Sequence, residues 1–284
     1  MKGIRNIEYI CKKYLMIVFA PAKINIGLYV TSKRDDGYHN IESVLYPSSL
    51  EDVIEIVHSE SFQLNEYGLL SMCKPEKNLC TIAWKLLADQ YSIPPVKINL
   101  LKNIPVQAGL GGGSSDAVAL LKGLNQMFEI GLSGDELRKI ALQIGSDCPF
   151  FVDAVPAFAT SRGEMLQPID LSLKDLFLLI IKPPVGVSTA QAFSEIVPAE
   201  HGLLLSSIMQ PVHAWSQSIS NVFEGVFYKH FPEVLKITES IKTQNPIFFS
   251  LNGSGSSFFA LSYKPLSTCE IPKEWYVLQS KLEN

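Results

Sequence analysis

The feature that most constrains this chain is a glycine-rich stretch at residues 105–117, with the sequence PVQAGLGGGSSDA. Four glycines fall within five residues, and two serines follow them. Downstream, apolar residues recur with the i, i+3, i+4, i+7 spacing of an amphipathic helix: Ala117, Leu120, Leu121, Leu124 and Phe128. Upstream, residues 96–100 alternate as in a strand. The pattern predicts a strand, a glycine loop and a helix, with Ser114 or Ser115 as the helix N-cap.

This arrangement is suited to binding an anion. A helix N-terminus carries a partial positive charge and unpaired N–H donors, and glycines let the backbone come close to phosphate oxygens. The loop lacks the Gly-Lys-Ser/Thr of a Walker A motif, and Ser114 stands where the third glycine of a dinucleotide fingerprint belongs. A loop that merely caps a core helix remains an alternative on these residues alone.

Length and composition limit the classes of protein to consider. A chain of 284 residues forms one large domain or two ordinary ones, and 47% hydrophobic with 18% charged residues indicates a packed, folded protein. A net charge of −4 without a long basic run argues against nucleic acid as the main partner. Cysteines are odd in number, without a Cys-x-x-Cys pair, which predicts free thiols in a reducing, cytoplasmic compartment. The five are Cys11, Cys73, Cys80, Cys148 and Cys269.

The N-terminal region superficially resembles a signal peptide. Two lysines precede an apolar run of six residues at 14–19, followed by small residues at 20–22. That run is shorter than the usual ~7–15 residues, and Pro21 disfavours cleavage. We expect a first strand at 16–20. Residues 1–18 would comprise an N-terminal extension and the start of this strand, unless the true start codon lies further downstream. No segment reaches the ~20 apolar residues of a membrane span, so no membrane partner is expected.

The remaining pattern predicts strands mainly in the first third and more helices later. Strands are expected at 24–30, 41–46, 53–57 and 62–64, in an antiparallel arrangement around a polar turn at 31–40. Helices are expected at 78–90 and at 133–144, the latter with a capping box from Ser133 and Glu136 and with Gly145 as terminator. Beyond a boundary near 152–162, strands are expected at 176–181, 247–251, 257–261 and, at a sheet edge, 275–278. Helices are expected there at 191–197, 201–209, 221–229 and 232–243. This order favours an α+β fold in two lobes.

Three motifs together resemble those of the GHMP kinases: PAKIN at 21–25, GLGGGSS at 109–115 and NGSGS at 252–256. Two more, RDDGYH at 34–39 and GSDCPFF at 145–151, resemble the branch of that family that phosphorylates a cytidine-diphosphate-linked polyol in non-mevalonate isoprenoid biosynthesis. The resemblance spans about residues 19–261. It implies a two-lobed GHMP kinase fold, with the active site in the cleft between the lobes. The N-terminal lobe (19–160) would have a mostly antiparallel sheet and helices, and the C-terminal lobe (161–284) would be an α/β sandwich-like layer.

The resemblance also implies the reaction: ATP as donor, Mg²⁺ as counter-ion, and transfer of the γ-phosphoryl group to the 2-hydroxyl of the polyol. Mg²⁺ is often held chiefly by nucleotide phosphates, and no dedicated metal ligands are predicted. The predicted ATP-binding residues are Pro105, Val106, Gln107, Ala108, Gly109, Leu110, Gly111, Gly112, Gly113, Ser114 and Ser115. Gln107 and Ala108 depart from the small residues that relatives often carry there, while 109–115 is intact.

Two residues match the catalytic positions of the family. Asp147 would accept the proton of the acceptor hydroxyl, although an aspartate after Gly145 is also a natural helix N-cap. Lys23 would stabilise the developing negative charge and keep Asp147 ionised. The alternative for Lys23 is a strand-end lysine that snorkels to water.

Substrate binding is implied for several further residues. Tyr38 would stack on cytosine and His39 would read its polar edge, unless His39 is a solvated turn histidine. Phe193 would be the opposing ring, near Thr189, although an amphipathic helix would also bury Phe193 in a core. Asn25 would bind the polyol or its phosphates, unless it is a strand-surface residue. Gly253 and Ser254 would close the site, unless residues 253–256 form a simple hairpin turn.

Two other functions stay open on the sequence. One is a GHMP kinase acting on mevalonate, homoserine or a sugar, against which Asp-Gly-Tyr-His argues because those substrates carry no cytidine. The other is a catalytically silent nucleotide-binding module, against which the presence of both Lys23 and Asp147 argues. We expect a monomer or a weak homodimer.

Overall fold

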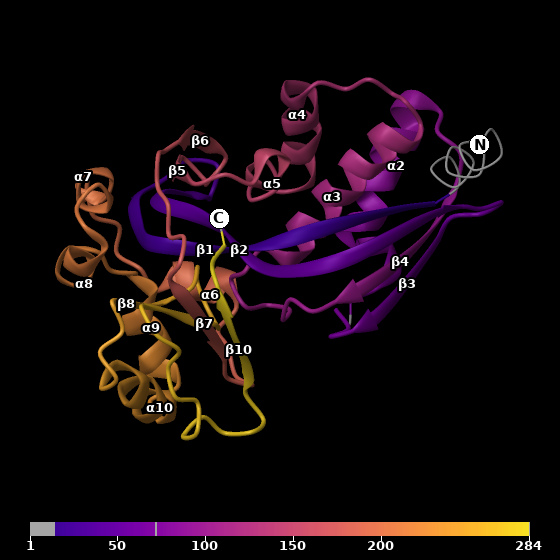
Figure 1. The fold of residues 1–284 in the computed structure, drawn as a ribbon. Helices are drawn as coiled ribbons and strands as arrows, with labels where there is room; N and C mark the ends of the chain where they lie inside the picture. The colour runs from indigo at the N-terminus through magenta and orange to yellow at the C-terminus, as the bar shows by residue number, and fades with distance from the viewer. Residues whose placement is uncertain (1–14, 72, 284) are drawn as a thin grey trace. The chain divides into compact units, whose positions relative to one another are not determined.

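The computed structural model describes residues 15–71 and 73–283 (Figure 1). Its strands are β1 (Leu15–Lys33), β2 (His39–His58), β3 (Gln63–Gly68), β4 (Val96–Lys102), β5 (Ala157–Thr160), β6 (Met165–Pro168), β7 (Phe177–Lys182), β8 (Phe248–Leu251), β9 (Phe258–Ser262) and β10 (Tyr276–Lys281). Its α-helices are α2 (Leu79–Tyr91), α3 (Gly112–Met127), α4 (Gly134–Ile144), α5 (Phe150–Asp153), α6 (Thr189–Ser194), α7 (Leu204–Ile208), α8 (Trp215–Ser218), α9 (Phe223–His230) and α10 (Glu233–Lys242). Short 3₁₀ turns are η1 (Pro75–Lys77) and η2 (Val212–Ala214).

The chain forms two compact units that interleave in sequence. Of the described residues, the first unit draws on 15–22, 50–71, 73–106 and 111–154, and the second on 23–49, 107–110 and 155–283. The predicted domains at 19–160 and 161–284 meet at a single point in the sequence, whereas the two compact units interleave. The predicted division into these two domains therefore stays a prediction. Most of the predicted N-terminal extension, with Cys11, lies outside the described residues. The four described cysteines are free thiols, and no helix within residues 15–71 and 73–283 is both long and apolar enough to span a bilayer.

Two long strands, β1 and β2, contribute residues to both units. The sequence pattern predicted each of them as two shorter strands, which is wrong. The predicted gaps contain Pro21 and Pro47, and proline lacks an N–H donor. Its fixed φ is nevertheless compatible with an extended backbone, so a proline in these strands does not end them. The predicted turn at 31–40 shortens accordingly, because β1 continues to Lys33 and β2 begins at His39.

In the first unit, β4 pairs with β3 on one side and with Val53–His58 of β2 on the other. The β2–β4 pairing is antiparallel, as expected, but β3 runs parallel to β4, so the antiparallel prediction for residues 62–64 is wrong. The reason is the connection: α2 crosses over between β3 and β4, and a helical crossover returns the chain in the same direction.

Helix α3 is central to the first unit and packs against α2, α4 and α5 (Figure 1). Ala117, Leu120, Leu121 and Leu124 are fully buried, which confirms the apolar face predicted for this helix. The fifth predicted position, Phe128, is the half-buried C-cap and meets the ring of His58 edge-on. Helix α4 has the predicted capping box and ends at Gly145, whose backbone is extended.

In the second unit, a four-stranded antiparallel sheet has the order β10-β7-β9-β8, and β10 lies at its edge as predicted. Aromatic side chains such as Phe223, Phe227 and Phe258 form a buried cluster with residues of this sheet. A hairpin of β5 and β6, which the sequence pattern did not predict, pairs with Ser43–Leu45 of β2. These elements position the turns and loops that carry the candidate site residues of this unit.

Candidate active site

The glycine loop leads into helix α3, whose N-terminus differs from the prediction in one respect. The helix begins at Gly112 and its N-cap is Gly111, with φ of 72°, so Ser114 and Ser115 lie in the first turn and are not caps. A left-handed backbone at the cap position favours glycine over serine. The cap supplies no side-chain hydrogen bond, so the first-turn N–H groups remain available to an anion.

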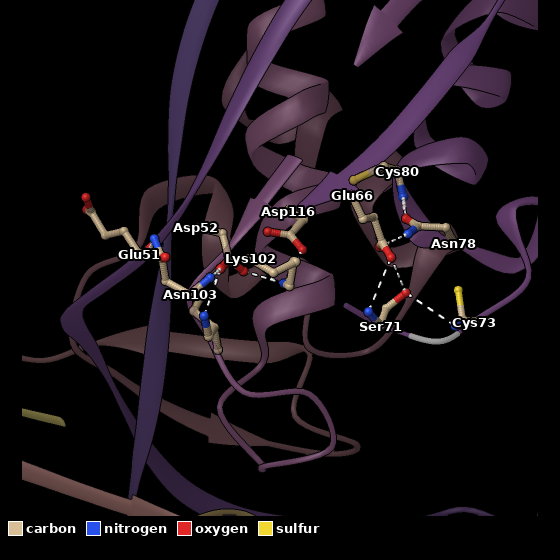
Figure 2. Close-up of polar contacts among 11 residues, drawn as sticks. Glu51, Asp52, Glu66, Ser71, Cys73, Asn78, Cys80, Lys102, Asn103 and Asp116 are labelled. Atoms are coloured by element: carbon tan, nitrogen blue, oxygen red, sulfur yellow. Dashed lines mark hydrogen bonds and ion pairs between the residues drawn. The ribbon is translucent and has the colours of Figure 1, made fainter. Parts of the chain in front are cut away.

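The start of α3 lies against a buried charged side chain. A Cβ on Gly112 would lie 2.9 Å from Ile104 Cγ2 and 3.3 Å from Lys102 Nζ, which leaves little room for any residue but glycine. Lys102 donates to the carboxylates of Asp52 and Asp116, with 2.6 Å between its Nζ and Asp116 Oδ2 (Figure 2). We call Asp52, Lys102 and Asp116 the buried triad, since their side chains are 0–4% exposed.

The triad carries two acids for one base. Asp52 Oδ1 accepts the backbone N–H groups of Asn103 (2.5 Å) and Ile104 (2.8 Å), whereas Asp116 Oδ1 has no hydrogen-bond partner in the described chain. Burial raises the pKa of Asp116 well above its usual range, against the opposing effect of Lys102. Burial alone would lower the pKa of Lys102, but the two carboxylates outweigh it and raise that pKa. The sequence prediction missed this triad. The available signal was Lys102, a charged residue at the end of a buried strand directly before the glycine loop.

A second polar group fixes the start of helix α2 (Figure 2). Asn78 caps α2 by accepting from Cys80 N at 2.9 Å, and its Nδ2 donates to Glu66 Oε1 at 2.7 Å. The hydroxyl of Ser71 donates to the other Glu66 oxygen at 2.7 Å. Because α2 packs directly on α3, these bonds also help to fix the position of the helix that follows the glycine loop.

Asp147 lies in the turn between α4 and α5 and is exposed. The N-cap of α5 is Pro149, so the alternative prediction of Asp147 as a helix cap is wrong. The neighbouring Cys148 thiol is hydrogen-bonded to Ser114 in the first turn of α3, and burial raises the pKa of this thiol to about 11. The first unit therefore ties the segment that carries Asp147 to the helix N-terminus that follows the glycine loop.

In the second unit, Lys23 is 4% exposed, which contradicts the alternative of a lysine that snorkels to water. Its Nζ donates to Asn25 Oδ1, and its backbone N donates to Leu110 O at 2.9 Å. Asn25 is also 4% exposed, so it is not a strand-surface residue. Its amide Nδ2 donates to Ser43 Oγ at 2.8 Å and its backbone N donates to Asn252 Oδ1 at 2.7 Å.

The loop at 252–257 packs against residues 107–110 of the glycine loop, within the second unit. A Cβ on Gly109, whose φ is +76°, would lie 2.1 Å from Asn252 O, so this close backbone approach requires glycine. The Ser257 hydroxyl donates to Ala108 O at 2.5 Å. The loop does connect β8 and β9 as a hairpin, but these contacts make it more than a simple turn.

Asn221 holds this second loop and was not predicted as a site residue. Its Nδ2 donates to Leu251 O at 2.8 Å and to Gly253 O at 2.7 Å, and its Oδ1 accepts Phe223 N at 2.9 Å. Side-chain hydrogen bonds to a distant backbone leave no local periodicity, so the sequence pattern contained no signal for it.

The predicted nucleoside-binding residues also gather in the second unit. The rings of His39 and Phe193 are 5.1 Å apart, so His39 is not simply a solvated turn histidine. Phe193 also packs against the buried cluster and meets Phe223 at 4.8 Å, so it contributes to the core as well. Thr189 Oγ1 lies 3.2 Å from Ser254 Oγ. Tyr38 is 55% exposed, and the guanidinium of Arg162 lies over its ring.

The site residues are thus divided between the units. Asp147 and residues 111–115 belong to the first; Lys23, Asn25, Tyr38, His39, Thr189, Phe193, Gly253 and Ser254 belong to the second. The pairing of Lys23 with Asp147 stays a prediction. Within the described residues, no group of three or more His, Cys, Asp or Glu side chains could hold a metal ion.

Comparison with known proteins gives the family. Residues 78–155 match the profile described as the GHMP kinases N terminal domain. A 4-diphosphocytidyl-2-C-methyl-D-erythritol kinase from Parabacteroides distasonis is 44% identical, over 88% of this chain and 93% of that protein. One from Bacteroides thetaiotaomicron is 43% identical, over 89% of this chain and 94% of that protein.

Solved structures agree on the fold. A crystal structure of 4-(cytidine 5'-diphospho)-2C-methyl-D-erythritol kinase superposes with a TM-score of 0.75 at 30% identity, covering 88% of this chain and 91% of that one. A mevalonate kinase superposes with a TM-score of 0.64 at 17% identity, over 87% of this chain and 91% of that one, a likeness of fold alone. The chain therefore belongs to the 4-diphosphocytidyl-2-C-methyl-D-erythritol kinase family, within the GHMP kinases.

Proposed function

We propose that this chain transfers the γ-phosphoryl group of ATP to the 2-hydroxyl of 4-(cytidine 5'-diphospho)-2-C-methyl-D-erythritol, as a cytoplasmic step of non-mevalonate isoprenoid biosynthesis. The observation that carries the proposal is 44% identity across 88% of the chain to a kinase named for that substrate. The arrangement of each unit supports it, and we expect the enzyme to act as a monomer or a weak homodimer.

The glycine loop and the first turn of α3 would bind the donor. The first turn of α3 has no side-chain cap, so its N–H groups can face the phosphates of ATP, which residues 105–115 would surround. The buried hydroxyl of Ser115 has no hydrogen-bond partner in the described residues, so the turn has donor and acceptor capacity left for a solvated Mg²⁺–phosphate group. Bound to the phosphates, Mg²⁺ would supply neutralisation of the charge on the transferring group.

The acceptor chemistry would use Asp147 and Lys23. The exposed Asp147 carboxylate caps no helix, so it is free to take the proton of the 2-hydroxyl. The buried ammonium of Lys23, oriented through Asn25, would stabilise the negative charge that develops as the hydroxyl attacks the phosphorus. Asn25 itself would contact the polyol or its phosphates.

The nucleoside of the acceptor would bind in the second unit. Tyr38 offers an exposed ring for stacking on cytosine, and His39 lies beside Phe193, the second ring. The pair of Thr189 and Ser254 hydroxyls, with Gly253, would contact the diphosphate and polyol portion.

The test is Asp147→Asn, with Asp153→Asn as control. Loss of a general base lowers kcat by about 10²–10⁴-fold, while the Kd for ATP and the melting temperature stay unchanged. Asp153 is an exposed carboxylate of the same unit, and its substitution should leave kcat unchanged. Turnover is measured as ADP release with the cytidyl polyol, mevalonate or homoserine as acceptor.

Two results would contradict the proposal. Unchanged kcat in Asp147→Asn would remove Asp147 as the base. Faster turnover with mevalonate or homoserine than with the cytidyl polyol would assign the chain to another GHMP activity.

A further inference from the structure

A guanidinium covers one face of the ring that we assign to cytosine stacking. Arg162 Cζ lies 4.9 Å from the centroid of the Tyr38 ring, within the range of a cation–π contact. Tyr38 lies in the turn between β1 and β2, and Arg162 lies in the turn between β5 and β6. Both residues belong to the second unit. The inference drawn from this contact rests on the proposed function.

Arg162 is held by its own turn. Its backbone N donates to Glu164 Oε2 at 2.7 Å, and its Nε forms an ion pair with Glu164 Oε1 at 3.5 Å. Ser161 Oγ donates to the same Oε1 at 3.0 Å. Burial by itself would raise the pKa of Glu164, but these hydrogen bonds outweigh it and lower that pKa, so the carboxylate is charged at neutral pH. A charged Glu164 therefore holds the guanidinium in place.

Tyr38 is held by the opposite turn. Its backbone N donates to Asp36 Oδ1 at 3.1 Å, and its carbonyl accepts from Arg34 N at 2.9 Å. Arg34 joins the two turns, since its Nη1 donates to Ser161 Oγ at 3.1 Å. Arg34, Asp36, Tyr38, Ser161, Arg162 and Glu164 together are called the turn cluster below.

This geometry leaves one face of Tyr38 for a base. Arg162 lies over one face of the ring, yet 55% of Tyr38 remains exposed, so ring surface that the guanidinium does not cover is open to solvent. A planar base stacks on an aromatic ring face, and a ring held by a cation on its far side loses less freedom when the base binds. The contact therefore both orients the ring and decides on which face a base can stack.

We propose that Arg162 is a positioning residue for the cytidyl substrate, acting through Tyr38 by covering one ring face and presenting the other to cytosine. Arg162 makes no direct contact with the nucleotide in this proposal. The contribution of Arg162 to ligand affinity should therefore require the Tyr38 ring. It should be the same whether or not the ligand carries a diphosphate.

The test is a double-mutant cycle of Arg162→Gln and Tyr38→Leu, with cytidine 5'-diphosphate and cytidine as titrated ligands. We expect Arg162→Gln to weaken both ligands by about 2–5-fold, the value of an exposed cation–π contact. In the Tyr38→Leu background, Arg162→Gln should cause no further loss. Arg162→Lys should retain most of the affinity, because an ammonium can also lie over the ring. In steady-state assays KM for the cytidyl substrate should rise while kcat and the KM for ATP stay constant.

Three results would overturn the inference. The first is a loss of affinity from Arg162→Gln that is equal with and without the Tyr38 ring. The second is a loss of affinity for cytidine 5'-diphosphate but not for cytidine, which would indicate a direct contact with phosphate. The third is wild-type affinity in Arg162→Gln. Arg138→Gln, an exposed arginine of the first unit, is the matched control and should bind normally. A wild-type protein that binds neither ligand would instead overturn the proposed function, and this inference with it.

Discussion

Two charged groups of this molecule use similar side chains in opposite surroundings. In the buried triad, Lys102 and its partners Asp52 and Asp116 are nearly inaccessible to water. In the turn cluster, Arg34 and Asp36 form a bidentate pair at 3.0–3.1 Å, but their side chains are 32% and 44% exposed. Water screens the ion pairs of the second group and not those of the first, so an ion pair in one group affects stability differently from an ion pair in the other.

The difference also separates two roles. The triad lies beneath Gly112, where a change would disturb the N-terminus of α3 and the fold of the first unit together. The turn cluster includes Tyr38, where a change would alter the surroundings of the proposed base-stacking ring and leave the core of the second unit in place. Substitutions in the buried triad are therefore expected to affect folding, whereas substitutions in the exposed turn cluster are expected to affect ligand binding without unfolding the unit.

The largest expected effect is that of Lys102→Met. The substitution leaves two buried carboxylates without their cation, and removal of one partner of a buried ion pair costs about 3–5 kcal/mol. The free energy of unfolding, measured by urea titration, should fall by that amount. Arg138→Met is the matched control, because it removes exposed ion pairs with Asp135 and Asp153 and should leave the unfolding free energy nearly unchanged. Equal losses in the two variants would show that burial does not distinguish the pairs.

The next expected effect depends on pH and is that of Asp116→Asn. Burial raises the folded-state pKa of Asp116 above its ordinary value of 3.8. The stabilisation that the protonated Asp116 side chain gives the folded state is therefore fully present below pH 3.8. That contribution is lost as pH rises through the raised pKa. Asparagine has no proton to lose. Above pH 3.8 the free energy of unfolding of the variant should therefore rise relative to that of the wild type by up to about 1.4 kcal/mol per pH unit, until the pH passes the raised pKa. Urea unfolding of both proteins across pH 4–8 measures this difference; parallel pH profiles would contradict it.

Local signals in the sequence predicted much of this fold, and long-range pairings account for most of the rest. The capping box of Ser133 and Glu136 was predictable because both partners lie within one helical turn. The partnership of Asp52 with Lys102 was not, because it depends on the pairing of β2 with β4, which sets Val53 opposite Leu101. The glycine cap of α3 was missed because the rule for hydroxyl caps ignores the backbone angle at Gly111.

The candidate site follows the same division. The residues at motif positions were identified by their order along the chain, although their pairing across the two units stays a prediction. Arg162 was missed, since it is distant in sequence from Tyr38 and reaches it through the β5–β6 hairpin, whose four-residue strands carry little periodicity. Sequence reasoning thus located the motifs and could not locate the side chains from another segment that contact them.

The smallest expected effect is that of Arg34→Gln, which breaks the exposed pair with Asp36 and one link between the two turns. The unfolding free energy should stay within experimental error of the wild type, because water already solvates both groups. The KM for the cytidyl substrate should rise about 2-fold at low salt, since the turn that holds Tyr38 loosens. At 1 M salt the screening length is about 3 Å, so the wild type should lose this advantage and the two KM values should converge. Stability dependent on the buried triad should not respond to salt in this way. A loss of unfolding free energy in Arg34→Gln comparable to that of Lys102→Met would mean that the turn cluster, although exposed, supports the fold as strongly as the triad does.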